Sequence, residues 1–172
     1  MLRKPTPADV EAPPAFLVDP EVMQWLGGVE DPHVVVRQWL AGWETFPAGK
    51  FIVETRAGAV IGRVGLNFFD PQTWARSAAA DAQPELTWGL AREHWGHGYA
   101  TEAAIAVRDW FGAARYVSLI APGNIRSQAV ARRLGAIPGE TIADFEESGP
   151  HVVWEHPPPA APGSARRARP II

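Results

Sequence analysis

The sequence of 172 residues contains no cysteine, which excludes disulfide bonds, thiolate metal sites and a cysteine nucleophile. No run of about 18 apolar residues occurs, so no membrane-spanning helix is expected. The N-terminal segment is charged and proline-rich and lacks the apolar core of a secretion signal. We therefore expect a cytoplasmic protein with no membrane contact and no metal cofactor.

A strongly basic face is also missing, since the formal net charge is -3 at pH 7. Binding to the phosphate backbone requires such a face, so nucleic acid is not an expected partner. Arg166, Arg167 and Arg169 lie among prolines and alanines near the C-terminus. This pattern is more typical of a solvated tail than of a contact with a membrane or nucleic acid.

The chain is 47% hydrophobic and 20% charged, which suits one globular domain with a continuous core. We place that domain at residues 1–156. Residues 157–172 are rich in proline, alanine and arginine and are predicted to form a disordered tail.

Apolar spacing predicts an N-terminal helical region followed by strands. Residues 8–46 contain patterns of short helices, at residues 20–26 and 32–43, and are interpreted as a helical cap. The next predicted segments are strands at residues 51–54 and 60–68, a long loop at 71–84 and a strand at 85–90.

The second half of the chain alternates strands and helices, which predicts a mixed α/β fold. Its predicted segments are a helix at residues 100–111, a strand at 117–120, a helix at 127–134 and strands at 140–143 and 151–154.

A glycine turn precedes the helix predicted at residues 100–111. The first amides of a helix have no partner within it and lie at the positive end of its dipole, so they can bind phosphate. Glycines let the ligand approach closely, although glycines at a helix entry also serve ordinary packing. The spacing matches neither G-x-x-x-x-G-K-[ST] nor G-x-G-x-x-G, which argues against nucleotide hydrolysis and Rossmann binding. The turn reads Trp95-Gly96-His97-Gly98-Tyr99-Ala100-Thr101.

Further segments before and after this turn carry a resemblance. They are Glu85-Leu86-Thr87-Trp88-Gly89-Leu90, then Glu102-Ala103 directly after the turn, and Asn124-Ile125-Arg126-Ser127. In this order they resemble the GNAT superfamily of N-acetyltransferases, and within it the RimJ/RimL-like subgroup, over about residues 1–155. The resemblance implies the GNAT fold, a splayed and mostly antiparallel sheet of about six or seven strands flanked by helices.

The resemblance also implies acetyl-CoA as cosubstrate, with its pyrophosphate on the glycine turn and its pantetheine arm along the strand ending at Leu90. Trp95 stands where the family often has Gln or Arg, which shifts phosphate recognition to backbone amides. Arg92 and His97 either add positive charge there or are exposed loop residues. Asn124 either contacts the pantetheine arm or caps a helix. The implied cofactor-binding residues are Trp88, Gly89, Leu90, Arg92, Trp95, Gly96, His97, Gly98, Tyr99, Ala100, Thr101, Asn124 and Ser127.

Acetyl transfer to an amine needs a neutral nitrogen, a polarised carbonyl and a proton source for the leaving thiolate. The resemblance implies Glu85 as general base, acting through water, and Ser127 as proton donor to the sulfur. Glu85 is alternatively an exposed carboxylate at a strand end, and Ser127 a residue that favours a helix start. Arg132 and Arg133 either approach the CoA phosphates or belong to a solvated helix face.

The expected acceptor is a primary amine, either a peptide or protein N-terminal α-amine or a small cationic amine. Deprotonation at pH 7 costs about 1 kcal/mol for an α-amine and about 4.6 kcal/mol for a lysine amine, so a simple base suits the α-amine better. An acidic surface near the acceptor would favour a cation, although such surfaces are often only solvated. The acidic residues are Asp9, Glu11, Asp19, Glu21, Glu30, Asp31 and Glu44 in the predicted cap and Asp144, Glu146 and Glu147 in a late loop.

Other functions remain open on the sequence. A non-catalytic module that binds or senses acyl-CoA would keep the glycine turn without needing Glu85 or Ser127. A purely structural domain would leave the turn without any ligand. Monomers and homodimers are both compatible with the sequence.

Overall fold

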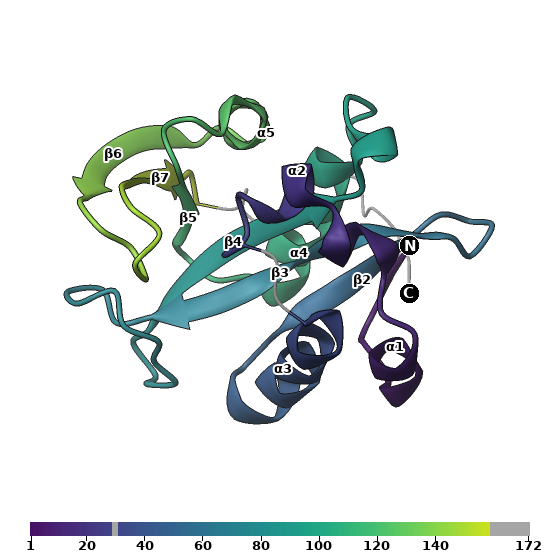
Figure 1. Cartoon of the computed structure of the whole chain (residues 1–172). Coiled ribbons are helices and arrows are strands. Elements are labelled where there is room, and N and C mark those ends of the chain that lie inside the picture. The colour runs from purple at the N-terminus through teal and green to yellow at the C-terminus, as the bar shows by residue number, and fades with distance from the viewer. Residues whose placement is uncertain (29–30, 159–172) are drawn as a thin grey trace.

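The computed structural model describes residues 1–28 and 31–158, and a seven-stranded sheet runs through them (Figure 1). Its strand order is β1-β2-β3-β4-β5-β7-β6, and neighbouring strands are antiparallel except for the parallel pair β4 and β5. This architecture confirms the predicted mixed α/β fold. The strands are β1 (Leu2–Arg3), β2 (Lys50–Glu54), β3 (Val60–Phe69), β4 (Gln83–Leu90), β5 (Tyr116–Ile120), β6 (Ile137–Ile142) and β7 (His151–His156).

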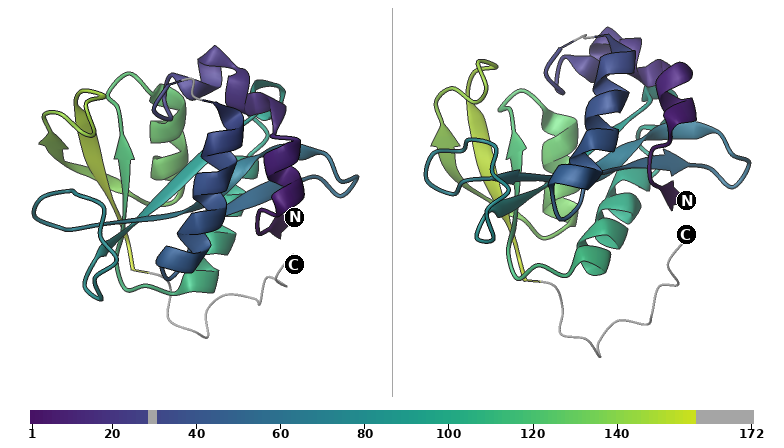
Figure 2. Two further views of the ribbon diagram at one scale, coloured as in Figure 1. Left: turned by 60° about the horizontal axis from the view of Figure 1, so that its bottom comes forward. Right: turned by 90° about the horizontal axis from the view of Figure 1, so that it is seen from below.

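Helices cover both faces of the sheet, with α3 and α4 on opposite sides (Figure 2). The predicted helical cap is confirmed, because the N-terminal helices gather on the α3 side. Among the helices of the described residues, none combines the length and apolar character that a membrane crossing requires. The helices are α1 (Pro7–Glu11), α2 (Pro20–Met23), α3 (Pro32–Thr45), α4 (Tyr99–Phe111) and α5 (Ile125–Arg133), with short 3-10 turns at Ala15–Val18 and Arg92–His94.

The cap helices begin where the sequence provides acidic N-caps followed by proline. The Asp19 carboxylate accepts a hydrogen bond from the Glu21 amide at 2.9 Å, and Asp31 accepts one from the His33 amide at 2.9 Å. Each pairs a free amide of the first turn, and the proline that follows needs no partner for its nitrogen. These local signals explain why α2 and α3 were predictable.

The two faces of β3 and β4 differ in chemistry because successive side chains of a strand point to opposite sides. One face packs against α4 in the main core, where Val64, Leu86, Ala104 and Val107 are buried together. The other face carries polar side chains toward the cap. Those residues are Arg63 and Asn67 of β3 and Glu85 and Thr87 of β4.

Some segments differ from the sequence-based expectations. β1 was not predicted, because two residues are too short to show alternation. β6 was predicted at residues 140–143 and begins earlier, at Ile137, which is 66% exposed and precedes Pro138. Exposed apolar and proline residues are tolerated there because β6 is an edge strand. Apart from residues 157–158, the predicted disordered tail lies outside the described residues.

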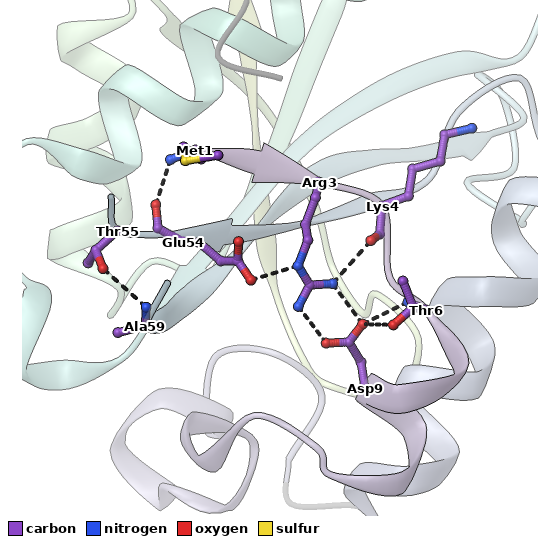
Figure 3. A network of polar contacts seen from close by, with 8 residues as sticks. All are labelled: Met1, Arg3, Lys4, Thr6, Asp9, Glu54, Thr55 and Ala59. Atoms are coloured by element: carbon purple, nitrogen blue, oxygen red, sulfur yellow. Dashed lines mark hydrogen bonds and ion pairs between the residues drawn. The ribbon is translucent and has the colours of Figure 1, made fainter. Parts of the chain in front are cut away.

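Arg3 joins the N-terminal strand β1 to the cap and to β2 through two carboxylates (Figure 3). Arg3 donates through two guanidinium nitrogens to the two Asp9 carboxylate oxygens, both at 2.7 Å, and through Nε to Glu54 at 2.6 Å. Asp9 also accepts from the backbone amide and the hydroxyl of Thr6, at 2.7 and 2.8 Å. The Arg3 hydrogen bonds, with those from Thr6, lower the pKa of Asp9 to about 2 despite its burial.

This network predicts an acid-sensitive contribution to stability. Asp9→Asn should lower the free energy of unfolding at neutral pH by about 1–2 kcal/mol, because it removes charge-assisted hydrogen bonds. The folded-state pKa of Asp9 lies below its usual value of 3.8, so the contribution is present above about pH 4 and is lost as pH falls toward 2. Urea unfolding at several pH values measures both effects.

Asp109→Asn serves as the matched control, since Asp109 is 47% exposed and pairs with the adjacent Arg108 at the surface. Its effect should stay within about 0.5 kcal/mol. An Asp9→Asn effect that is the same at pH 2 and pH 7 would contradict the assigned pKa.

Candidate active site

The sheet opens between its two parallel strands. β4 and β5 pair through Glu85 and Val117, whereas β3 pairs with β4 along its whole length to Leu90. Figure 1 shows β5 turning away from β4 beyond this point. The edge of β4 that leads to Leu90 therefore faces an opening, and its peptide groups on that side are available to a ligand.

A cavity of about 300 Å³ lies in this opening. It is bordered by the end of β4, by the glycine turn before α4 and by the start of α5. Most of the residues predicted to bind the cofactor are brought together in its wall. They are Trp88, Gly89, Leu90, Trp95, Gly96, Gly98, Tyr99, Ala100, Thr101, Asn124 and Ser127.

The glycine turn has the geometry of an anion site. Gly96 and Gly98 have φ angles of 80° and 84°, in the left-handed region that favours glycine, and nothing lies within 4 Å of the positions their Cβ atoms would take. The Glu102 amide donates to Gly98 O at 3.0 Å, so the preceding amides come before the helical ladder. Thr101 Oγ1 is buried and has no hydrogen-bond partner among the described residues. A phosphate oxygen placed at this turn would pair these donors.

Trp95 contributes through its side chain to the shape of the site. Its Nε1 donates to Leu90 O at 2.8 Å, which fixes the ring across the end of β4. The guanidinium carbon of Arg126 lies 4.4 Å from the centroid of the Trp95 ring, in cation–π range. Arg126 and Arg133 both line the cavity. The role of Arg126 was missed, although it stands inside the segment that carries the family resemblance.

Arg92 and His97, two other predicted residues, make their contacts outside the cavity wall. Arg92 pairs with Glu21 at 2.7 Å and Asp19 at 3.6 Å, and His97 stacks on the Tyr99 ring, so neither belongs to the cavity wall. A cofactor contact by Arg92 or His97 therefore stays a prediction that this arrangement does not favour.

The start and the exposed face of α5 bear on two of the open alternatives. Asn124 Oδ1 accepts from the Ser127 amide at 3.1 Å and caps α5, while its side chain also lines the cavity. The two roles considered for Asn124 are thus compatible, since the cap uses only the side-chain oxygen. Arg132 donates to Gln128 at 3.3 Å and does not line the cavity.

A second cavity, of about 770 Å³, lies on the cap side of the sheet. Trp25 and Leu26 line both cavities, so the two adjoin beneath the cap. The cap wall of this second cavity is mostly apolar, with Leu17, Met23, Val35, Trp39 and Phe46 beside the side-chain amide of Gln38. The floor carries Lys50, Arg63, Asn67, Glu85 and Thr87.

Glu85 lies in this floor and is only 6% exposed, so its alternative interpretation as an exposed carboxylate is wrong. Asn67 Nδ2 donates to Glu85 Oε2 at 2.6 Å. The Asn67 carbonyl oxygen in turn accepts from Lys50 Nζ, which also donates to Leu66 O at 2.9 Å. A continuous chain of hydrogen bonds therefore holds the carboxylate in place.

Burial changes the acidity of the neighbouring cations. It lowers the pKa of Lys50 well below its usual value, and the nearby charge of Arg63 lowers it further. It lowers the pKa of Arg63 to about 10, although the negative charge of Glu85 acts in the opposite direction. Arg63 remains a cation at pH 7. These floor residues were missed, yet polar side chains at Arg63 and Asn67, both facing the same side of an apolar strand, were the available signal.

The predicted acidic surface is placed differently from expectation. Asp9 pairs with Arg3, and Asp19 and Glu21 pair with Arg92. None of the described acidic cap residues lines the second cavity, and Glu30 lies outside the described residues. The cavity does include Glu146 and Glu147 of the late loop. Asp9, Asp19, Glu21 and Asp31 therefore serve capping or ion pairs, and the cap presents a mostly apolar wall.

Residues 1–137 match the family model described as an acetyltransferase (GNAT) domain. The chain belongs to the GNAT acetyltransferase family. It is 32% identical over 149 residues to the uncharacterized protein YkkB of Bacillus subtilis (strain 168), an alignment that covers 80% of this chain and 79% of YkkB.

Solved GNAT structures share the fold. An acetyltransferase from Agrobacterium tumefaciens str. C58 superposes with a TM-score of 0.70 at 29% identity, covering 90% of this chain and 88% of that one. The aminoglycoside acetyltransferase AAC(6')-Ib, solved with coenzyme A, has a TM-score of 0.74 at 18% identity and covers 91% of this chain and 94% of its own. The assignment to the RimJ/RimL-like subgroup stays a prediction.

The geometry of the glycine turn predicts that Gly98→Val weakens acetyl-CoA binding at least tenfold, measured as Kd by calorimetry. Valine is strained at this φ angle and its branched side chain fills the space through which a phosphate reaches the amides.

Gly58→Val is the matched control, because Gly58 has φ of 83° and equally open surroundings but lies in the β2–β3 turn. It should strain the backbone similarly and leave acetyl-CoA binding unchanged. Equal affinities in both variants would show that the turn does not hold the cosubstrate.

Proposed function

We propose that this protein transfers an acetyl group from acetyl-CoA directly to a primary amine. The observation that carries the proposal is that one strand, β4, borders both cavities. Glu85 and Thr87 face the second cavity, while Trp88, Gly89 and Leu90 line the first. A thioester along the end of β4 would thus meet an acceptor held beside Glu85. The RimJ/RimL-like assignment and a cytoplasmic location belong to the same proposal and rest on the sequence.

Acetyl-CoA fits the first cavity by the chemistry of its walls. The amides of the glycine turn and the unpaired Thr101 hydroxyl would receive the pyrophosphate. Arg126 and Arg133 would add positive charge for the phosphates. The open edge of β4 would pair with the amides of the pantetheine arm as an added strand, and the Asn124 side-chain NH₂ would donate to a carbonyl of the arm.

The acceptor cavity then supplies the acid–base chemistry. Glu85 takes a proton from the ammonium group, directly or through water, and the neutral nitrogen attacks the thioester carbon. A backbone amide near Leu90 stabilises the charge that develops on the carbonyl oxygen. The carbon–sulfur bond breaks as the amide forms, and Ser127 gives a proton to the departing CoA thiolate. No covalent intermediate with the protein is needed.

Glu85→Gln should lower kcat by about 100-fold and leave the Kd for acetyl-CoA unchanged. Glutamine keeps an oxygen for the hydrogen bond from Asn67 and removes only the basic group. Release of CoA thiol with a panel of primary amines measures turnover, and calorimetry measures binding.

Glu93→Gln provides the control, because Glu93 is exposed in the 3-10 turn Arg92–His94 and lines neither cavity. It should turn over like the unmodified protein. Full turnover by Glu85→Gln across the pH range would exclude Glu85 as the base. Tight acetyl-CoA binding without thiol release for any amine would instead identify a non-catalytic acyl-CoA-binding module.

A further inference from the structure

Arg63 is a buried cation in the wall of the acceptor cavity. The residue is 8% exposed, and its Nη1 donates to Thr87 Oγ1 at 3.0 Å. Within residues 1–28 and 31–158, no carboxylate forms an ion pair with it. A guanidinium group has five N–H donors, and a buried charge without a counterion is costly.

The other charges of the cavity have nearer partners. Arg76 pairs with Glu146 at 3.2 Å at the cavity rim, where both side chains are about half exposed. Lys50 donates to Asn67 and to the Leu66 carbonyl oxygen. The charged residues around the cavity are Lys50, Arg63, Arg76, Glu85, Glu146 and Glu147.

The position of Arg63 in the sheet places its charge where the two cavities meet. Arg63 stands opposite Gly89, one of the β4 residues that line the thioester cavity, and four residues further along β3 Asn67 stands opposite Glu85. Gly89 has no side chain, and a Cβ there would come within 2.7 Å of Leu26 Cδ1. The cap leucine therefore covers this point, and Thr87, two residues before Gly89 on the same face of β4, is the side chain that Arg63 contacts.

We propose that the acceptor carries an oxyanion beside its amine, and that Arg63 binds this oxyanion while Glu85 receives the amine. The inference rests on the proposed function and names its substrate class. Arg63 and Glu85 lie on one face of the sheet with opposite charges and without contact between them, an arrangement that suits a zwitterion.

The apolar cap wall narrows the class further. Leu17, Met23, Val35, Trp39 and Phe46 face the polar floor across the same cavity. An acceptor that fills this space needs an apolar body in addition to its charged groups. A hydrophobic α-amino acid is the simplest molecule with all of these features, and its products would be the N-acetyl amino acid and CoA.

The test compares acceptors that share the phenylalanine body and differ in the group beside the amine. Thiol release is measured with phenylalanine, with its phosphonate analogue and with phenylalaninamide, using the full chain and Arg63→Gln. The full chain should prefer at least one of the two oxyanions over the amide by about 10- to 100-fold in kcat/KM. Arg63→Gln should remove this preference mainly through KM. The carboxylate and phosphonate arms distinguish which oxyanion the site accepts.

A binding measurement that needs no turnover accompanies the kinetics. N-acetylphenylalanine should bind the CoA-loaded protein more tightly than N-acetylphenylalaninamide by calorimetry, and Arg63→Gln should equalise the two. Arg63→Lys keeps the positive charge but loses the planar guanidinium group that can donate two hydrogen bonds to one oxyanion, and it should retain part of the preference for the oxyanion over the amide. Arg56→Gln, an identical change at an exposed residue of the β2–β3 turn, should leave the preference intact.

The possible failures are distinct. If the amide is used as well as both oxyanions, or if Arg63→Gln keeps the preference while still binding acetyl-CoA, the inference is wrong. If Arg63→Gln lowers kcat equally for every acceptor, Arg63 serves the thioester and the inference is also wrong. If acetyl-CoA binds but no amine releases thiol, the proposed function fails and the inference fails with it, whereas turnover of polyamines alone contradicts only the inference.

Discussion

The parallel contact between β4 and β5 is the constraint on which the site depends. The two strands pair at Glu85 and Val117 and then separate, while Ser118 Oγ donates across to Leu86 O at 2.5 Å. Beyond that point β4 has a paired edge toward β3 and a free edge toward the opening. Free backbone groups in a sheet interior need a partner, and a ligand with amides along its length can provide one. The same geometry brings the glycine turn and the start of α5 to the two sides of the opening.

A second constraint is the alternation of side chains along β3 and β4. One face joins the main apolar core under α4, so the residues that alternate with the core-facing ones lie on the opposite face. Here the chain places Arg63, Asn67, Glu85 and Thr87 under the cap, with Lys50 added from β2. Buried charges at this density are unfavourable for stability alone, because each loses its hydration. The hydrogen bonds through Asn67 and Thr87 reduce that cost, and the remaining unpaired capacity of Arg63 is what a bound substrate can use.

Much of the fold was predictable because its signals are local. Asp19 and Asp31 precede prolines at helix starts, a run of apolar residues marks β3, and apolar residues at helical spacing mark the buried face of α4. β1 was missed because a strand of two residues is too short to show a period. The true start of β6 was missed because a proline, here Pro138, is tolerated in a strand mainly at the edge of a sheet, and the sequence alone does not show which strand is at the edge. In the site, the glycine turn and its neighbours could be identified from their order along the chain. Arg63, Lys50 and Asn67 could not, because their shared function appears only after β2, β3 and β4 are paired in register.

The sequence by itself determined the order of the longer elements, the glycine turn that precedes α4 and the resemblance to GNAT enzymes, since each depends on neighbours in the chain. Only the tertiary structure decided that Glu85 is buried, that Arg92 is engaged by Asp19 and Glu21, and that the acidic cap residues turn away from the acceptor cavity. It also decided that the cavity floor carries the charge of Arg63, which forms no ion pair with any carboxylate of the described residues. Burial, ion pairing and the meeting of two cavities are relations between residues far apart in sequence, and only strand register and helix packing establish them.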